Sequence, residues 1–224
     1  MKILIINPNT DQATTSAIQS VADQYAGGRF TATCLSAPGG PHFIATYEHQ
    51  VQSAAGMIAL VRQYEQEVDA FVVACHADPN LDCLKEITTK PVVGIGEASM
   101  KVASMLGHSF SVISPVDHSI PNKEALAAKY HLSGALASVR APQKTTATIP
   151  MPEKLLQAAK LAIEEDMAEV IVLGCAGFAG LDRQLEQQLG VPVLDSVVCS
   201  LIIAEGLVRY GVSTSKARRY NPIF

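Results

Sequence analysis

The chain has 224 residues with 17 basic and 21 acidic side chains, a formal net charge of −4, and a composition that is 48% hydrophobic and 17% charged. Such a chain is too apolar to be intrinsically disordered, and its scattered Lys and Arg residues form no basic stripe for a nucleic acid. Its longest apolar runs fall far short of the roughly 20 residues that cross a bilayer, and its N-terminus does not resemble an export signal, so we expect a cytoplasmic globular protein without a membrane partner.

Short β-branched runs alternate with amphipathic segments along the whole chain, which is typical of strand–helix units around a buried parallel sheet. Eight strands are expected, over residues 2–7, 30–35, 70–74, 91–94, 110–113, 134–139, 170–173 and 192–195. Helices are expected over residues 13–25, 47–66, 98–106, 153–165 and 197–210, several of them after a capping residue such as Asp11, Thr46 or Ser196. Residues 35–46 and 141–150 are expected to be irregular, and the first of these stretches is long enough for a binding loop.

The second half of the sequence repeats the first. Cys75 follows the apolar run 71–73 and Cys175 follows the apolar run 171–173, each with a short helix expected after it. The repeat predicts two pseudosymmetric α/β lobes with parallel sheets and a cleft between them. Ligands of open parallel sheets bind at the carboxyl ends of the strands, so both cysteines are expected to face that cleft. The lobes are expected to comprise residues 1–95 plus 197–224 and residues 96–196.

Two thiols on opposite sides of one ligand can invert a carbon centre. The thiolate is the reactive form of cysteine, and its pKa falls at a helix N-terminus, which is the setting predicted for Cys75 and Cys175. One thiolate can remove a proton from a carbon acid while the other thiol returns a proton to the opposite face. Small residues beside the sulfurs would let backbone N–H groups hold the developing oxyanion; they include Ala77, Gly174, Ala176 and Gly177. The sequence has no metal, PLP or nucleotide motif, so no metal or cofactor is expected.

Several of these residues also have a purely structural interpretation. A single cysteine at the end of a buried strand is usually a core residue, and we interpret Cys34, Cys83 and Cys199 as core or surface residues because they have no partner in the repeat. With five cysteines and no C-x-x-C spacing, reduced thiols are expected rather than disulfides. His76 could steer the neighbouring thiolate or contact a ligand, or it could be an exposed or backbone-bonded histidine.

Polar residues near the strand ends also allow two interpretations. Asn9 and Ser114 follow equivalent strands of the two halves, and each could close a turn or hold a ligand carbonyl. Glu97 could face the cleft or cap the helix that follows it. The helices after the cysteines are expected to be capped by Asp78, Asp82 and Asp182.

Five motifs, in order along nearly the whole chain, resemble the hydantoin racemase and allantoin racemase branch of the aspartate/glutamate racemase superfamily. They are Ile-Asn-Pro-Asn-Thr at residues 6–10, Gly40-Pro41 with Ile44, Ala74-Cys75 with Asp78-Pro79, Val-Gly-Ile-Gly-Glu-Ala at residues 93–98, and Leu-Gly-Cys-Ala-Gly at residues 173–177. The resemblance implies two Rossmann-like lobes, racemisation by two bases without a cofactor, and often a homo-oligomer. It makes Cys75 and Cys175 the paired acid and base, and it implies that the substrate is held by Asn9, Ile44, His76, Ala77, Ser114, Ala176 and Gly177.

The sequence departs from its apparent relatives close to the expected pocket. Amino-acid racemases have Asn or Thr after each cysteine, whereas this chain has His76 and Ala176, which disfavours a free amino acid as substrate. Within the branch an aromatic residue usually follows the first cysteine and Ile-Glu-Ser follows Gly-Pro, whereas here His76 and Ile44-Ala45-Thr46 stand at those positions. These differences leave the preferred 5-substituent of a hydantoin open.

Other activities of the same scaffold remain alternatives. They are cis–trans isomerisation of maleate, amino-acid racemisation, decarboxylation of a substituted malonate, and non-enzymatic binding of a small anion. Decarboxylases of the superfamily retain only the second-half cysteine, so the presence of Cys75 disfavours that reaction. A hydantoin suits the chemistry because its C5–H lies between a carbonyl and a ring nitrogen, which makes the proton more acidic than that of an amino acid.

Overall fold

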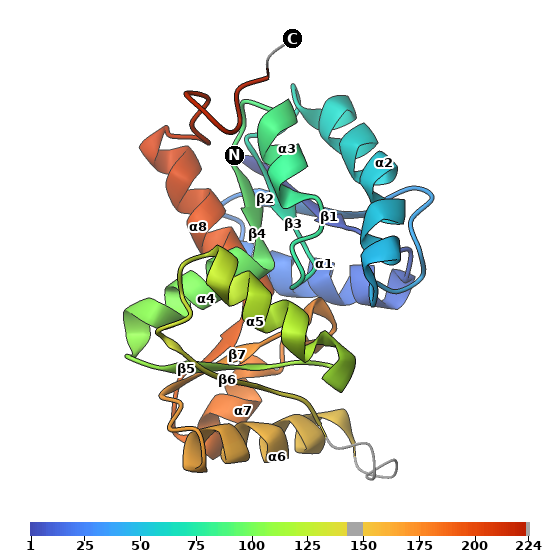
Figure 1. Cartoon of the computed structure of the whole chain (residues 1–224). Coiled ribbons are helices and arrows are strands. Elements are labelled where there is room, and N and C mark those ends of the chain that lie inside the picture. The colour runs from blue at the N-terminus through green and yellow to red at the C-terminus, as the bar shows by residue number, and fades with distance from the viewer. Residues whose placement is uncertain (143–149, 223–224) are drawn as a thin grey trace.

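The computed structural model describes residues 1–142 and 150–222, which form two parallel sheets of four strands each. The strand orders are β2-β1-β3-β4 and β6-β5-β7-β8, so the second sheet repeats the order of the first. The strands are β1 (Lys2–Asn7), β2 (Thr31–Ser36), β3 (Ala70–Val73), β4 (Val92–Gly94), β5 (Phe110–Ile113), β6 (Leu136–Arg140), β7 (Val170–Leu173) and β8 (Val193–Asp195). Figure 1 shows one sheet above the other, which confirms the predicted two-lobed α/β fold.

The register of each sheet brings the ends of its central strands to one edge. Ile6 of β1 pairs with Val73 of β3, and Ile113 of β5 pairs with Leu173 of β7. Every residue of β3 and β7 is buried, as expected for strands that helices cover on both faces. The loops that begin after these strands therefore start side by side at the carboxyl edge of each sheet.

Along the sequence, each helix lies between two strands, except α8, which follows the last strand. Within the described residues they are α1 (Gln12–Ala26), α2 (Tyr47–Tyr64), α3 (Leu81–Ile87), α4 (Ile95–Leu106), α5 (Ile120–Lys129), α6 (Met151–Glu164), α7 (Asp182–Leu189), α8 (Ser196–Tyr210) and the short 3-10 helices Asp117–Ser119 and Ala176–Phe178. In the described part of the chain, none of them is both long and apolar enough to cross a lipid bilayer.

The expectations for the helices were wrong in three places. The cap of α8 is Asp195 rather than Ser196, because the Asp195 carboxylate accepts two backbone N–H groups of the first turn. Helix α4 begins at Ile95 rather than at residue 98. Helix α5 was not expected at all, although Pro121 lies in its first turn, where a missing N–H breaks no helical hydrogen bond. Most of the irregular stretch expected at 141–150 lies outside the described residues.

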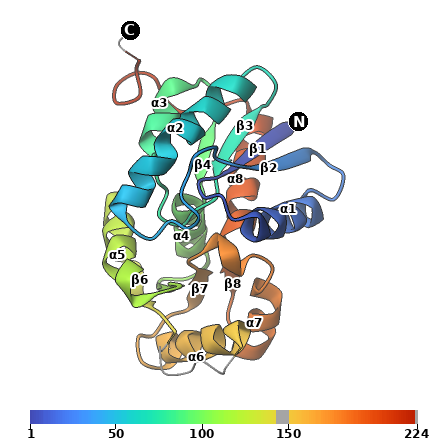
Figure 2. The ribbon, with the colours of Figure 1, turned by 90° about the vertical axis from the view of Figure 1, so that its right-hand side faces the viewer.

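Helix α4 belongs to the cores of both lobes. Its Ile95 and Ala98 are buried in the apolar cluster of the first sheet. Its Met100 and Ala103 are buried in a cluster of the second sheet, with Phe110 of β5. Figures 1 and 2 accordingly place α4 between the two sheets from both directions of view. The lobes therefore share one helix as a common wall.

Helix α8 follows the last strand of the second sheet but packs in the first lobe. Its Val197, Leu201 and Ala204 are buried in the same cluster as Ile5 of β1 and Val72 of β3. The division of the chain into residues 1–95 plus 197–224 and residues 96–196 stays a prediction, because α4 contributes to both cores.

Candidate active site

The two cysteines of the repeat line a single cavity. Its volume is about 260 Å³, and its walls come from the loops after β1, β2, β3 and β7 and from α5. Ligand pockets for drug-sized molecules occupy about 300–1,000 Å³, so this cavity suits a small heterocycle. Of the site residues expected from the sequence, those that line it are Asn9, Ile44, Cys75, His76, Ala77, Gly174, Cys175, Ala176 and Gly177.

Ser114 is the expected site residue that does not line the cavity. It is fully buried, its N–H donates to the Arg140 carbonyl at 2.7 Å, and its Oγ donates to the Val116 carbonyl at 3.0 Å. The repeat places Ser114 after β5 as it places Asn9 after β1, and these bonds show that Ser114 closes a turn there.

Asn9 closes the turn before α1 and also lines the cavity. Its Oδ1 accepts hydrogen bonds from Asn7 Nδ2 and from the Asp11 N–H, each at 2.9 Å, and this closes the turn before α1. Its Nδ2 has no partner among the described residues, and Asn9 lines the cavity. The amide N–H groups of Asn9 are therefore available to a ligand carbonyl.

Cys75 lies at the end of β3 and is partly exposed to the cavity. Burial raises the pKa of its thiol to about 12, while a hydrogen bond from the Ala77 N–H acts in the opposite direction. The expected helix N-terminus at this cysteine is wrong, because α3 begins only at Leu81. The pKa is therefore raised rather than lowered in the free protein, since the loss of water outweighs one backbone donor.

Cys175 occupies the equivalent place after β7 and is the N-terminal flanking residue of the short 3-10 helix Ala176–Phe178. Burial raises the pKa of this thiol as well, against a hydrogen bond from the Gly177 N–H and the positive charge of Lys123. The two thiols also affect each other, because charge on Cys175 raises the pKa of Cys75. This coupling disfavours the ionisation of both sulfurs at the same time.

His76 is buried rather than exposed, and its ring is bonded to the side chains of two other residues. Its Nε2 is 3.3 Å from Ser99 Oγ, and its Nδ1 is 3.3 Å from Lys123 Nζ. Burial, followed by the charge of Lys123, holds the pKa of the imidazole well below its usual range. The ring is therefore neutral near pH 7 and lines the cavity as a hydrogen-bonding group.

Asp78 caps a different helix from the one expected. Its carboxylate accepts hydrogen bonds from the N–H groups of Gly96 and Glu97 at the start of α4, and from Tyr130 Oη at 2.6 Å. Burial raises its pKa to about 6. A Cβ atom on Gly96 would lie 2.8 Å from Asp78 Oδ2, so this close approach requires glycine.

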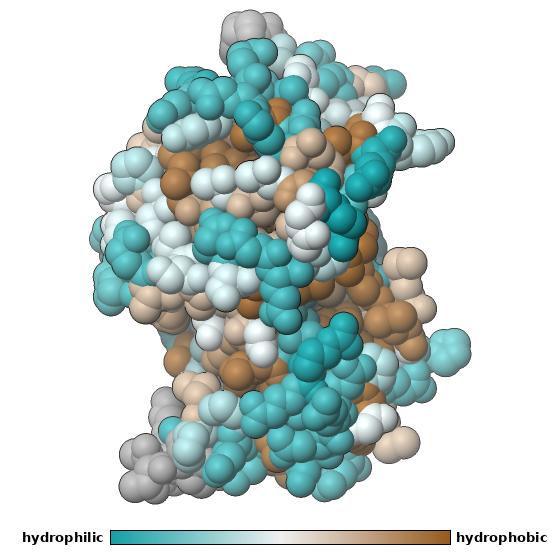
Figure 3. All heavy atoms as spheres, turned by 180° about the vertical axis from the view of Figure 1, so that it is seen from behind, coloured by the Kyte–Doolittle hydropathy of each residue, from teal (hydrophilic) through white to brown (hydrophobic). Residues whose placement is uncertain are grey.

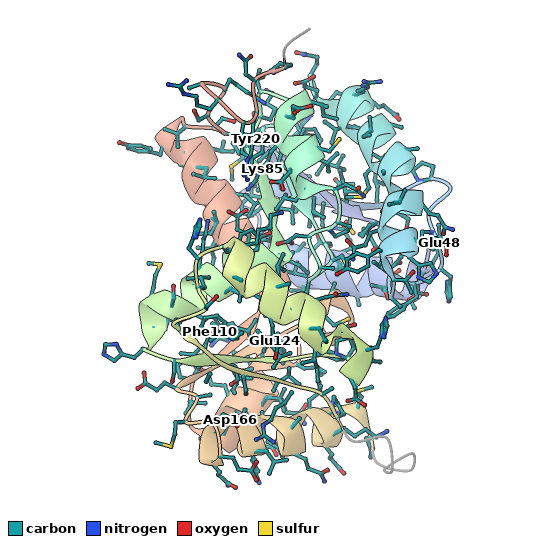
Figure 4. All side chains as sticks on the ribbon, viewed as in Figure 1. Glu48, Lys85, Phe110, Glu124, Asp166 and Tyr220 are labelled. Atoms are coloured by element: carbon teal, nitrogen blue, oxygen red, sulfur yellow. The ribbon has the colours of Figure 1, made fainter. Side chains whose placement is uncertain are left out.

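The other acidic candidates lie outside the cavity. Glu97, in the first turn of α4, forms ion pairs with Lys85 and Lys101. Asp82 accepts a hydrogen bond from Tyr220 and pairs with Lys129, and Asp182 lies 3.6 Å from Arg183 at the start of α7. Neither α3 nor α7 has a side-chain cap, so the capping expected of Asp82 and Asp182 is wrong. Figure 4 labels Lys85 and Tyr220 near each other in the upper lobe.

Sequence reasoning missed Lys123, the buried cation of the cavity. Lys123 lies in α5 at the spacing Ile120, Lys123, Leu126 and Ala127, which is the buried face of an amphipathic helix. A lysine on such a face is a signal of a special environment, but it was invisible because the helix itself was not expected. The cavity is also lined by residues that were not expected, including Phe43, Tyr47, Gln50, Asn122 and Lys129.

Metal-ligating side chains form no larger cluster in the part of the chain that the structure describes. Across residues 1–142 and 150–222, no group of three or more His, Cys, Asp and Glu side chains is placed to hold a metal ion. All five cysteines are free thiols, as expected. What the cavity offers is two thiols, backbone N–H groups, the amides of Asn9, Gln50 and Asn122, and a buried ammonium.

A duplicated α/β protein with equivalent cysteines on one cavity has the architecture of the racemases that its motifs resemble. The chain belongs to the Asp/Glu/Hydantoin racemase family, whose profile matches residues 3–201. It is 40% identical to a hydantoin racemase of Pseudomonas sp. (strain NS671), over 98% of this chain and 91% of that one.

Solved structures agree with this assignment. The allantoin racemase from Klebsiella pneumoniae has a TM-score of 0.94 and 30% identity, covering 100% of this chain and 94% of that one. The allantoin racemase from Pseudomonas fluorescens has a TM-score of 0.91 and 35% identity, covering 100% of this chain and 99% of that one. The resemblance found in the sequence motifs is thereby confirmed.

Proposed function

We propose that the protein racemises 5-substituted hydantoins, with allantoin as one member of that class, by removing and returning the proton at C5 without a cofactor. The observation that carries the proposal is the convergence of Cys75 and Cys175 on one cavity from equivalent places in the two lobes. Family membership and the hydantoin and allantoin racemases among its relatives support the choice of substrate class.

The reaction balances within the cavity. The thiolate of one cysteine takes the C5 proton and becomes a thiol, and the electron pair of the C–H bond spreads into the ring carbonyl as an enolate. The other cysteine gives its proton to the opposite face of C5 and becomes the thiolate. Product of the opposite hand leaves, and the two sulfurs have exchanged their protonation states.

Hydrogen-bond donors at the cavity can stabilise both the thiolates and the enolate. The N–H groups of Ala77 and Gly177 donate to the Cys75 and Cys175 sulfurs and stabilise each thiolate in turn. The Asn9 amide is available to a ring carbonyl. Donors that are fixed before the reaction stabilise developing charge without reorganisation, which is the largest catalytic term in many enzymes.

A screen of aliphatic, aromatic and ureido-substituted hydantoins by polarimetry in deuterated water tests the proposal. We expect loss of optical rotation together with deuterium at C5 for at least one of them. No exchange and no loss of rotation with any of them would contradict the proposal. Parallel assays for fumarate from maleate, for amino-acid racemisation and for ligand binding without turnover would then identify the alternative.

We also propose that the chain forms a homo-oligomer. The support comes from apolar side chains at the end of α4 and on α8 that remain exposed: Met105 at 79%, Leu106 at 54% and Ile202 at 44%. Figure 3 shows hydrophobic residues gathered along one edge of the rear face, where the C-terminal end of α4 lies. Light scattering would give a multiple of the 23.8 kDa chain mass, and a monomer would contradict the proposal.

A cytoplasmic location is the third part of this proposal. Its support is that all five cysteines are free, and thiols persist as such in reducing compartments. Fractionation of the source cells with detection by an antibody would test it. Recovery of the protein outside the cytoplasmic fraction would contradict it.

A further inference from the structure

One buried amino group is bonded to both cysteine loops. Lys123 is 5% exposed, and its Nζ donates to the Gly174 carbonyl at 2.7 Å and to His76 Nδ1 at 3.3 Å. Gly174 directly precedes Cys175, and His76 directly follows Cys75. A single ammonium of α5 therefore lies against the catalytic loops of the two lobes.

This ammonium has no carboxylate as its partner. Lys129, the other lysine at the cavity, lies 2.8 Å from Asp82, whereas Lys123 forms no ion pair within residues 1–142 and 150–222. A buried cation without a counter-charge is costly, and it persists only where an anion is supplied. The question is which group around Lys123 supplies it.

Few of the groups that face Lys123 can supply the negative charge that it needs. His76 is neutral. Asp78 is already engaged by two backbone N–H groups of α4 and by Tyr130 Oη. On its own helix, Glu124, labelled in Figure 4, is exposed to solvent. The remaining ionisable groups are the two thiols, Cys75 and Cys175.

The electrostatics of the cavity rank the two thiols ahead of Asp78 as neighbours of Lys123. Burial lowers the pKa of Lys123, and negative charge on Cys175, on Cys75 and on Asp78 raises it. In return, the ammonium lowers the pKa of both thiols. Such effects are reciprocal, because the interaction energy of two charges belongs to the pair.

A chain of hydrogen bonds holds the ammonium in place. Because Lys123 donates to Nδ1 of His76, the ring proton is on Nε2 and donates to Ser99 Oγ, which donates to the Ile95 carbonyl at 2.6 Å. An ammonium has three N–H donors, and within the described residues Lys123 uses two. The third is available to an anion in the cavity.

We propose that Lys123 is the shared counter-charge of the active site, which supports the thiolate on whichever of Cys75 and Cys175 is ionised at each half of the reaction. The alternation between the two sulfurs rests on the proposed racemisation. In such a reaction the negative charge moves from one lobe to the other, and a cation bonded to both loops serves both directions without moving. Lys123 is a positioning residue that acts through the thiols.

Alkylation of the substrate-free protein tests this inference. The thiolate fraction of each cysteine is followed by iodoacetamide labelling and peptide mass spectrometry between about pH 7 and pH 10. In K123M both Cys75 and Cys175 should be labelled at least about tenfold more slowly, because each thiol loses a neighbouring positive charge. K123R should recover part of the rate. K160M is the matched control, and its labelling should equal that of the wild type because Lys160 is exposed on α6 and does not line the cavity.

A converse measurement decides the matter even if K123M does not fold. In the double variant C75S/C175S, the 13Cε resonance of Lys123 should titrate at a lower pH than in the wild type, since the anions that hold its proton are gone. Unchanged labelling of both cysteines in a folded K123M, a change in only one of them, or an unchanged Lys123 titration would overturn the proposal. None of these measurements uses a substrate, so a failure to racemise hydantoins would be a separate result.

Discussion

In both lobes a buried carboxylate links the cysteine loop to the helix that follows the next strand, α4 in the first lobe and α8 in the second. In the first lobe the loop supplies the carboxylate, and Asp78 accepts the N–H groups of Gly96 and Glu97 at the start of α4. In the second lobe the strand end supplies it, and Asp195 caps α8 while it accepts the Gly180 N–H at 2.7 Å. The buried carboxylate is repeated, but the residue that carries it is not.

Steric crowding explains why the first lobe has no carboxylate at the end of its last strand. Gly94 ends β4 as Asp195 ends β8. A Cβ atom on Gly94 would collide with the carboxylate of Asp78, so the first lobe has room for one carboxylate only. Both lobes of this duplicated fold therefore have a buried carboxylate between the cysteine loop and a helix. The residue that supplies it comes from different sequence positions in the two lobes.

The largest effect is expected from removing one thiol at a time. C75S and C175S should each lower racemisation by about 10²- to 10⁴-fold, because a proton must be taken from one face and returned to the other. Each variant should still exchange C5 deuterium in one enantiomer, and the two variants should exchange opposite enantiomers. NMR of each resolved hydantoin measures this. Exchange of the same enantiomer by both variants would contradict the assignment of one face to each lobe.

The pH dependence is expected to be the next largest effect. Because burial raises the pKa of Cys75 to about 12 and also raises that of Cys175, thiolate is scarce at neutral pH. The value of kcat/KM should therefore increase with pH, by up to about tenfold per pH unit below the lower of the two thiol pKa values. Polarimetric rates between about pH 7 and pH 9 measure the slope. A rate that is flat or falls over this range would show that the raised thiol pKa values of the substrate-free protein do not control the reaction.

The two buried carboxylates provide a test on stability. D78N and D195N should each lower the free energy of unfolding by about 1–3 kcal/mol, because an amide oxygen replaces a carboxylate that accepts several N–H or O–H groups. The folded-state pKa of Asp78, about 6, lies above the ordinary value of 3.8. The folded protein therefore binds more protons than the unfolded chain in this interval, so the contribution of Asp78 to stability increases as the pH falls from about 7 to 4.

Urea unfolding of the wild type and D78N at the two ends of that pH range measures the difference. The gap between the two proteins should be larger at the acidic end. Burial also raises the pKa of Asp195, so D195N should behave in the same direction. Opposite pH trends for the two variants would show that the two carboxylates are not equivalent.

The smallest effects are expected from adding a single methyl group. G94A should destabilise the protein because its Cβ atom has no room beside Asp78. Gly206, exposed in α8, has nothing within 4 Å of its Cβ position, so G206A should stabilise the protein by about 0.5–1 kcal/mol through helix propensity. Thermal unfolding of both variants shows the opposite signs, and a neutral G94A would contradict the spatial argument for one carboxylate per lobe.

The strands, the duplication and the two cysteine loops of the cavity could be predicted from the sequence because they depend on local patterns. Apolar runs fix where a buried strand lies, and a parallel strand delivers the residue after it to the carboxyl edge, which is why Cys75 and Cys175 were placed together correctly. Burial then reversed the expected direction of their pKa shifts, since the sequence shows where a helix begins far less clearly than where a strand ends.

The features that could not be predicted depend on contacts between distant elements. Lys123 reaches the cavity from a helix whose sequence begins like a loop, and Asp78 caps a helix that starts beyond the next strand. An alignment of the two halves of the sequence also does not reveal the carboxylate of the second lobe, because Asp195 aligns with Gly94 rather than with Asp78. Such positions become equivalent only in space.

The return of α8 to the first lobe has a consequence for synthesis on the ribosome. The first sheet is complete once residue 94 has been made, yet Val197, Leu201 and Ala204, which cover it, are translated only after the whole second lobe. Nascent chains shorter than this therefore expose an apolar sheet surface that later chains bury. The first lobe can therefore complete its apolar core only after α8 has been synthesised, even though its own strands leave the ribosome first.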